Sequence, residues 1–313
     1  MKKRISIGSW AYVFGPYWDN PIPFEKVVQR LAELKFDGVE IIGFRPHPHP
    51  DDYASNSHRQ DLRALISGLG LGISGYAPDF SAHSLVRTDD HAGYIKAFEK
   101  NLGFARDLEM PAMRVDSIDP PTIFGEVSPD AALKRIVPTW QRCAELAANA
   151  GVLIVWEFEP GFAFNKPSEV LRLVNEVGHS NFKILFDTSH AYMSAVVAAR
   201  HQGQPERLKG GVTEMIQMLK GKIGHIHLID SDGTLRNDDT STHRPFGEGI
   251  LDFDAIMPAW NQSGCNSAWW AIDLCFWPRS WEATPACKQF VGRLNEKYGA
   301  AVHGKQTKQI AQL

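Results

Sequence analysis

Short apolar segments alternate with amphipathic segments along almost the whole chain. Each apolar segment has the length of a buried strand, whereas the longer segments place apolar residues at every third or fourth position, as helices do. Strands that alternate with helices pair in parallel through right-handed crossovers. Eight such pairs predict an α/β fold of one domain, a closed (β/α)8 or TIM barrel. The expected strands are 4–10, 38–44, 71–77, 111–117, 151–159, 182–188, 222–230 and 268–275, and the expected helices are 24–36, 57–69, 91–109, 129–149, 167–178, 206–221, 253–263 and 281–297.

The length of the chain fits this architecture. Barrels of about 250 residues commonly form one domain, and the 313 residues contain no linker or composition shift that marks a second one. We expect the barrel to span residues 1–300 and a polar tail to span residues 301–313. A doubly wound open sheet is the competing fold. That fold favours a glycine-rich phosphate turn after the first strand, and Gly8-Ser9-Trp10-Ala11-Tyr12 is not such a turn.

Charge and cysteine content bear on partners and compartment. Thirty-three basic and thirty-six acidic side chains give a net charge of -3, whereas duplex binders usually have a basic excess. The four cysteines show no CxxC spacing and indicate reduced thiols of a cytoplasmic protein. No apolar run approaches the roughly 18 residues of a membrane helix. We therefore expect neither a nucleic-acid nor a membrane partner.

The fifth expected strand carries two acidic residues near its C-terminal end. Alternation puts Val152, Ile154, Trp156 and Phe158 on the face that packs against helices, and puts Leu153, Val155, Glu157 and Glu159 on the inner face. Buried carboxylates are costly unless they are paired or bind a metal. Two inward glutamates at the mouth of a barrel, where catalytic groups cluster, therefore indicate a functional site.

The next three strands add polar groups at the same rim. Asp187 ends the sixth strand, His225 and His227 share one face of the seventh, and Asp273 lies near the end of the eighth. His225 is more readily explained as a hydrogen-bonded core residue, and Asp230 could cap the following loop. Glu157, Asp187, His227 and Asp273 together form a hard, mostly oxygen donor set. Such a set favours Mn²⁺, with Mg²⁺, Co²⁺ or Zn²⁺ as alternatives, and it can leave coordination positions open for substrate oxygens.

These motifs resemble the sugar phosphate isomerase/epimerase superfamily, the xylose-isomerase-like barrels that also include metal-dependent apurinic endonucleases. The resemblance covers about residues 5–297. It rests on Gly151-Val-Leu-Ile-Val-Trp-Glu157, on Phe186-Asp-Thr-Ser-His-Ala191, on His225-Ile-His-Leu-Ile-Asp230, and on Phe246-Gly-Glu-Gly249. It implies a divalent metal and proton transfer beside a sugar carbonyl. Asp273 stands where the group usually carries a glutamate, which is one methylene longer.

Glu159 is our preferred catalytic base, since it shares a strand face with Glu157 and lies nearer the mouth. A salt bridge from Glu159 to Arg244 is an equally good explanation of its position. Members of the superfamily also use metal-bound carboxylates as bases, so Glu157 and Asp273 are alternatives. Sugar contacts are expected from the rim residues, although loop packing explains each of them as well: Trp10, His49, His190, His243 and Arg244. His190 and His243 also match positions where endonuclease-like members carry additional metal-binding histidines.

The leading function is therefore a metal-dependent isomerase or epimerase of a keto or aldo sugar or a polyol. A lyase that eliminates a leaving group from a 3-oxo-glycoside, like the barrel subunits of C-glycoside-cleaving enzymes, begins with the same proton abstraction and is the main alternative. An abasic-site endonuclease and a non-catalytic sugar-binding barrel are more remote. The expected partner is a small-molecule sugar, and a homo-oligomer or a partner subunit is left open. The loop Lys209-Gly210-Gly211 reads equally as a phosphate-binding loop and as a turn.

Overall fold

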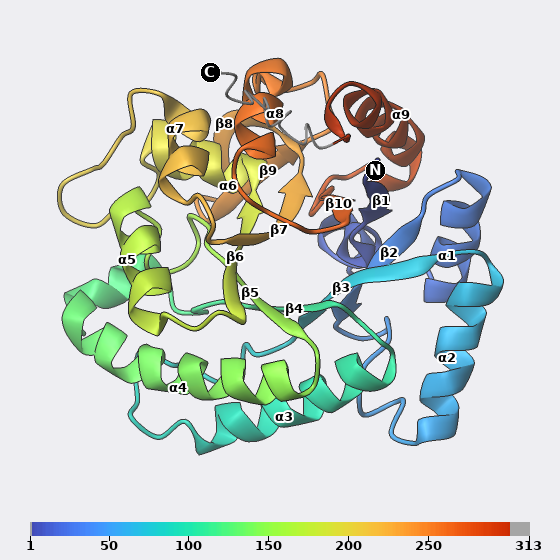
Figure 1. Cartoon of the computed structure of the whole chain (residues 1–313), viewed down its shortest axis with the longest axis horizontal. Coiled ribbons are helices and arrows are strands. Elements are labelled where there is room, and N and C mark those ends of the chain that lie inside the picture. The colour runs from blue at the N-terminus through green and yellow to red at the C-terminus, as the bar shows by residue number, and fades with distance from the viewer. Residues whose placement is uncertain (1, 301–313) are drawn as a thin grey trace, which may run out of the picture.

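The computed structural model describes residues 2–300, and the expected tail of residues 301–313 lies outside them. Eight parallel strands form one sheet in the order β1-β10-β7-β6-β5-β4-β3-β2, and a parallel bridge between Gly8 and Glu40 joins the two end strands into a ring (Figure 1). The predicted barrel is confirmed. Its strands are β1 Arg4–Ile7, β2 Gly38–Gly43, β3 Gly72–Pro78, β4 Ala112–Val115, β5 Leu153–Glu157, β6 Phe182–Asp187, β7 Ile223–Leu228 and β10 Trp269–Ile272.

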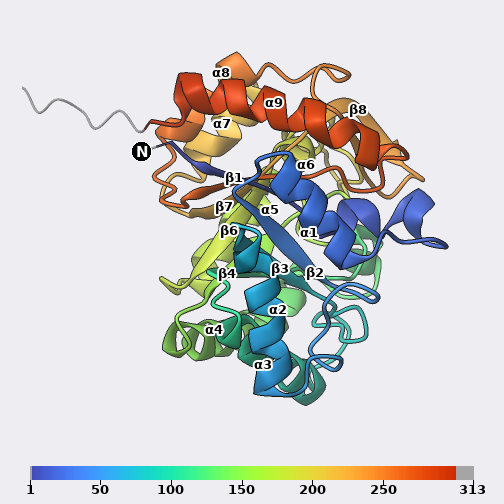
Figure 2. The ribbon, with the colours of Figure 1, turned by 90° about the vertical axis from the view of Figure 1, so that its right-hand side faces the viewer.

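Helices surround the strands, with α2, α3 and α4 on one side of the barrel and α8 and α9 on the opposite side (Figures 1 and 2). The long helices are α1 Phe24–Glu33, α2 Asn56–Gly68, α3 Ala92–Asp107, α4 Pro129–Asn149, α5 Pro167–Val177, α7 Gly211–Met218, α8 Phe253–Asn261 and α9 Ser280–Tyr298. Local signals set their starts. Ser128 accepts a hydrogen bond from the Ala131 amide, and proline occupies the first position of α4, which is the favoured arrangement at a helix N-terminus.

The alternation expected on β5 divides the hydrophobic residues into two layers. Leu153 and Val155 pack with Ala112 and Leu185 inside the barrel. Their neighbours Ile154, Trp156 and Phe158 belong to the larger core between strands and helices. In that core the ring centroids of Trp140 and Trp156 are 5.9 Å apart. The inner layer is small, and polar side chains replace it toward the C-terminal ends of the strands.

Several elements differ from the expected boundaries at those ends. β1 stops at Ile7 instead of residue 10, because Ser9–Tyr12 turns into a 3-10 helix. β10 stops at Ile272, so Asp273 lies just beyond the strand. α7 begins at Gly211 instead of residue 206, since Gly211 has a φ of +55° that a helix interior does not allow.

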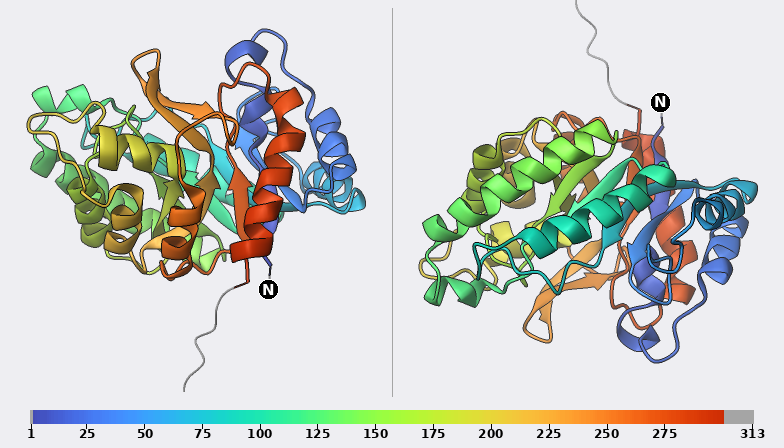
Figure 3. Two further views of the ribbon diagram at one scale, coloured as in Figure 1. Left: turned by 90° about the horizontal axis from the view of Figure 1, so that it is seen from above. Right: turned by 90° about the horizontal axis from the view of Figure 1, so that it is seen from below.

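Short elements without a counterpart in the expected pattern lie between the strands and helices. Gly15–Tyr17 and Pro121–Gly125 form 3-10 helices, α6 Thr188–Tyr192 continues into a π-helical turn at Met193–Val197, and β8 Asp230–Arg236 pairs with β9 Thr240–Arg244 as an antiparallel hairpin. Figure 3 shows the hairpin and the loop after β1 projecting from the same end of the barrel, opposite the N-terminus. Asp230 accepts hydrogen bonds from the Gly247, Gly249 and Leu251 amides, which confirms that it caps the loop that follows β9. Among residues 2–300, no helix has the length and apolar character needed to cross a membrane.

Candidate metal and substrate site

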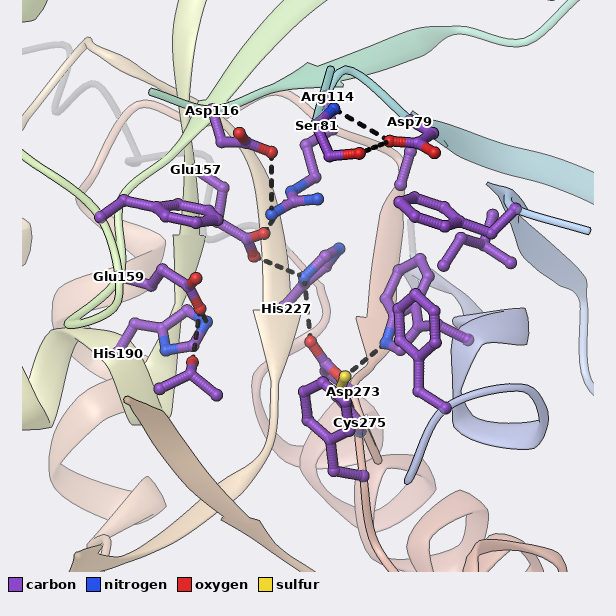
Figure 4. A pocket seen from close by; sticks show the side chains of 18 of the residues that line it. Asp79, Ser81, Arg114, Asp116, Glu157, Glu159, His190, His227, Asp273 and Cys275 are labelled. Carbon is purple, nitrogen blue, oxygen red and sulfur yellow. Dashed lines mark hydrogen bonds and ion pairs between the residues drawn. The ribbon is translucent and has the colours of Figure 1, made fainter. Parts of the chain in front are cut away.

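The C-terminal end of the barrel contains a cavity of about 410 Å³, within the usual range of ligand pockets. Figure 4 shows its labelled polar residues converging from different strands and loops. Seven of the predicted residues line it: Trp10, Glu157, Glu159, His190, His227, His243 and Asp273. The other three, His49, Asp187 and Arg244, are not among the lining residues. His49 accepts a hydrogen bond from the Asp51 amide within its own loop, and Arg244 pairs with Asp232 on the hairpin at 2.7 Å.

Glu157, His227 and Asp273 meet on the floor of the cavity. His227 Nδ1 lies 3.1 Å from Glu157 Oε1 and 3.5 Å from Asp273 Oδ2. One donor atom from each of the three residues lies within 4.8 Å of the others, and all three side chains are buried. Oxygen and nitrogen ligands about 2.0–2.2 Å from a cation are at most about 4.4 Å apart. The three residues could therefore close around one cation after a small adjustment.

Asp187, the fourth predicted ligand, lies in a second donor group with His190 and His243. It ends β6 and caps α6, since its Oδ1 accepts the Ser189 and His190 amides. His243, on β9, stands between the groups. Its Nε2 lies 3.8 Å from Asp187 Oδ1, and its Nδ1 lies 3.3 Å from Asp273 Oδ1. The structure thus brings together three of the four predicted ligands and places an imidazole between them and Asp187.

The polar atoms of the second group test whether these residues fit a metal. Asp187 Oδ2 is buried without a hydrogen-bond partner among the described residues, and neither ring nitrogen of His243 makes a hydrogen bond of good geometry there, although its Nδ1 lies 3.3 Å from Asp273 Oδ1. Buried polar atoms are rarely left unpaired in native proteins. Unpaired carboxylate and imidazole donors beside two more carboxylates form the donor set of a divalent cation. The residues therefore fit such a cation.

Arg114 and Glu40 are among the charged residues of the site that were missed in the sequence, as is Asp116. Arg114 on β4 forms ion pairs with Glu157 and, at 3.2 Å, with Asp116. Glu40 on β2 lies beneath His227, with its Oε1 3.2 Å from His227 Nε2 and its Oε2 2.8 Å from His225 Nε2. His225 is thus a hydrogen-bonded residue of the barrel interior, which is the explanation that the sequence favoured. Glu40 and Arg114 each interrupt an apolar strand, in Val39-Glu40-Ile41 and Met113-Arg114-Val115, and this interruption could have revealed both.

Glu159 lies just beyond β5, and the hairpin and α6 hold it in place. Thr240 Oγ1 donates a hydrogen bond of 2.5 Å to Glu159 Oε2, and His190 Nε2 lies 3.4 Å from the same oxygen. The other nitrogen of His190, Nδ1, is 2.8 Å from Ser241 Oγ. The salt bridge from Glu159 to Arg244 that the sequence allowed is not formed. The carboxyl group instead faces the cavity (Figure 4).

Burial and mutual charge shift the pKa values of the site in opposite directions. Burial raises the pKa of Glu159 to about 8 and that of Asp187 to about 7. Burial and the neighbouring His243 lower the pKa of His190 to about 3. Although burial opposes it, the charges of Asp273 and Asp187 raise the pKa of His243 to about 9. Against burial, Arg114 lowers the pKa of Glu157 to about 2. Such a spread is typical of functional sites.

Trp10 covers the floor from the side of β1. Its indole Nε1 donates a 2.7 Å hydrogen bond to Asp273 Oδ1, and its ring centroid lies 5.2 Å from that of His227. This bond fixes the orientation of a shortened carboxylate side chain.

A family model described as the xylose isomerase-like TIM barrel matches residues 28–285. The chain belongs to this family. The resemblance predicted from the sequence motifs is therefore confirmed.

Relatives of this xylose isomerase-like barrel cover most of its length. Fructoselysine 3-epimerase of Escherichia coli O157:H7 is 25% identical over 249 residues, 75% of this chain and 80% of the epimerase. Inosose dehydratase of Erwinia tasmaniensis is 24% identical over 290 residues, 87% of this chain and 89% of the dehydratase. The crystal structure of the IOLI protein with a bound zinc atom is similar with a TM-score of 0.72 at 16% identity, covering 96% of this chain and 100% of that one.

Proposed function

We propose that this chain is a divalent-metal-dependent enzyme that removes a proton from a carbon next to the carbonyl of a sugar or polyol. The observation that carries the proposal is the meeting of Glu157, His227 and Asp273 on the floor of one cavity, with Glu159 facing the same space. Glu157, His227, Asp273 and Asp187 would hold the cation, and Mn²⁺ is the metal that we favour. A cation there would polarise a sugar carbonyl and stabilise negative charge on its oxygen.

The residues around that position divide the remaining tasks. Glu159 takes the proton in its ionised form, which a pKa of about 8 makes more abundant as the pH rises, and Thr240 and His190 orient its carboxyl group. Arg114 holds Glu157 and the Trp10 indole holds Asp273, so neither carboxylate rotates away from the floor. The electron pair of the broken C–H bond moves toward the carbonyl oxygen. Return of a proton to the other face of the same carbon, or to the neighbouring carbon, gives epimerisation or isomerisation.

Elimination of a leaving group from a 3-oxo-glycoside is the second candidate. Loss of the same proton, with the electron pair expelling a group from the next carbon, gives a lyase. A dehydratase and an epimerase among the relatives are consistent with both outcomes. Apolar side chains above the floor, Phe14, Phe44 and Phe276 among them, can accommodate the leaving group that this reaction needs.

Exchange of the α-proton with solvent tests the function that both candidates share. The protein loaded with Mn²⁺ would be incubated in D₂O with D-fructose, D-psicose and both methyl and phenyl 3-oxo-glucosides, and deuterium incorporation and products would be followed by NMR. We expect exchange that EDTA abolishes and added Mn²⁺ restores. Products then separate isomerisation from elimination. Exchange that survives complete removal of metal would contradict metal dependence, and no exchange with any of these sugars would contradict the proposed proton transfer.

A further inference from the structure

The walls of the cavity differ sharply from its floor. Six of the eight strands are followed by a loop that contributes an apolar side chain to the lining, namely Phe14, Phe44, Phe80, Ile118, Phe162 and Phe276. The polar lining residues beyond β6 and β7 come from α6 and the hairpin, and His190 and Thr240 among them hold Glu159. Most polar groups thus lie on the floor and beside Glu159, with Asp79, Ser81 and Asp116 as further polar residues after β3 and β4, while aromatic and aliphatic groups make up the rest of the lining.

The aromatic part of this wall is already assembled. The ring of Phe14 stacks on that of Phe276 at 5.6 Å and meets that of Phe44 edge-on at 5.3 Å. Gly15, at φ +62°, brings the backbone close to Phe276, since a Cβ atom there would lie 3.2 Å from the Phe276 Cα atom. Rings that support one another present a flat surface with little freedom to rearrange. Such a preformed wall costs little entropy when a ligand packs against it.

A sugar without substituents would use this cavity poorly. Its ring can stack on one aromatic face, but away from the floor, the hairpin and the edge at Asp79 and Ser81 its hydroxyl groups would meet apolar side chains. A hydroxyl group that leaves water without gaining a partner loses free energy. A flat apolar group would instead gain free energy from burial between the wall of Phe14 and Phe276 and the side chains of Ile118 and Phe162.

We infer that the apolar part of the cavity, above the floor, is a subsite for an aromatic substituent, and that the substrate is a sugar conjugate with an aryl group instead of a free sugar. The inference rests on the proposed function for the floor, where the carbonyl and hydroxyl groups of the sugar would lie. It deepens that function by naming the substrate class. In the elimination pathway the aryl group would be the leaving group, and in the epimerisation pathway it would remain attached.

Equilibrium binding tests this subsite without requiring turnover. The Mn²⁺-loaded protein would be titrated calorimetrically with phenyl α- and β-glycosides of glucose and galactose, each paired with its methyl glycoside. We expect at least one phenyl glycoside to bind at least tenfold more tightly than its methyl partner. Equal affinities within every pair, or no measurable binding of any phenyl glycoside at millimolar concentration, overturn the inference.

Substitutions of Phe14 and Phe276 test whether the aromatic wall causes the preference for phenyl over methyl glycosides. Phe14→Ala and Phe276→Ala should each weaken phenyl glycoside binding at least fivefold and leave methyl glycoside binding unchanged. Trp18→Ala is the matched control, because Trp18 stacks on Phe14 yet is 66% exposed and does not line the cavity. A phenyl preference that persists in the Phe14→Ala/Phe276→Ala double variant, with its fold verified by circular dichroism, overturns the assignment. Wild-type protein that binds phenyl glycosides preferentially but exchanges no α-proton would refute the proposed reaction alone.

Discussion

His227 presents its two ring nitrogens to two different carboxylates, with Nδ1 3.1 Å from Glu157 Oε1 and Nε2 3.2 Å from Glu40 Oε1. If Nε2 donates its proton to Glu40, Nδ1 is the nitrogen that a cation between Glu157 and Asp273 could bind in place of a proton. A carboxylate that accepts a hydrogen bond from one nitrogen of a histidine orients the ring and makes the other nitrogen a more basic metal ligand. His225 occupies the other oxygen of Glu40 at 2.8 Å, so the carboxylate cannot rotate freely.

Glu40→Gln should therefore weaken metal binding although Glu40 does not itself face the cavity. An amide can present its NH₂ group to Nε2, which favours the other tautomer of His227 and removes the lone pair from Nδ1. We expect the affinity for Mn²⁺ to fall by about 10- to 100-fold, as measured by electron paramagnetic resonance titration of free Mn²⁺. Glu33→Gln, on the exposed end of α1, is the control. An unchanged Mn²⁺ affinity in folded Glu40→Gln protein would show that His227 needs no such partner.

Asp187→Ala tests whether the second donor group belongs to the same metal centre. The substitution removes a buried carboxylate whose Oδ2 has no partner in the described part of the chain. We expect less than one Mn²⁺ per chain after gel filtration, by elemental analysis, whereas Asp79→Ala on the exposed outer edge of the cavity should keep the wild-type content. Retention of a full equivalent by Asp187→Ala would remove Asp187 from the ligand set.

Glu159→Gln should retain metal and lose proton transfer. The amide keeps the shape of the side chain and can still accept the hydrogen bond from Thr240, but it cannot take a proton. Loss of a positioned base typically slows a reaction by about 10²- to 10⁴-fold, or about 3–5 kcal/mol. The measurement is deuterium incorporation at the α-carbon. Thr240→Val, which only loosens the carboxyl group, should cause a smaller decrease. Exchange at the wild-type rate in Glu159→Gln would transfer the role of base to Glu157 or Asp273.

Strand alternation makes part of the site predictable from the amino-acid sequence. Inward and outward residues separate cleanly on β5, so the pattern of that strand alone is enough to place Glu157 in the interior of the barrel. The position of His243 depends on the β8–β9 hairpin, whose strands are polar and lack an alternating apolar pattern. The His243 imidazole lies between Asp187 and Asp273, so the separation of Asp187 from the floor residues could not be predicted without the hairpin. Pairing across the barrel, as between Glu40 and His227, joins residues 187 positions apart and leaves no local signal.

His47 gives a prediction about stability that does not involve the cavity. Its ring is 1% exposed and packs edge-on against Phe24, its Nε2 lies 2.9 Å from the Ile22 carbonyl oxygen, and its Nδ1 has no partner within residues 2–300. Nε2 therefore carries the proton, and a second proton on Nδ1 would be buried without an acceptor. Burial lowers the pKa of His47 to about 4, although the Ile22 carbonyl and Glu25 oppose the shift.

Because the unfolded chain binds this proton near pH 6.5 and the folded chain only near pH 4, acid favours unfolding. The stabilisation is complete above about pH 6.5 and is lost as the pH falls toward 4, by about 3 kcal/mol for this group. Urea unfolding of wild type and His47→Gln at pH 7 and pH 4 measures it. His47→Gln, whatever its stability at pH 7, should lose about 3 kcal/mol less than wild type on acidification. His58→Gln, exposed on α2, should keep the wild-type pH dependence. Parallel losses in wild type and His47→Gln would mean that His47 binds its proton equally in both states.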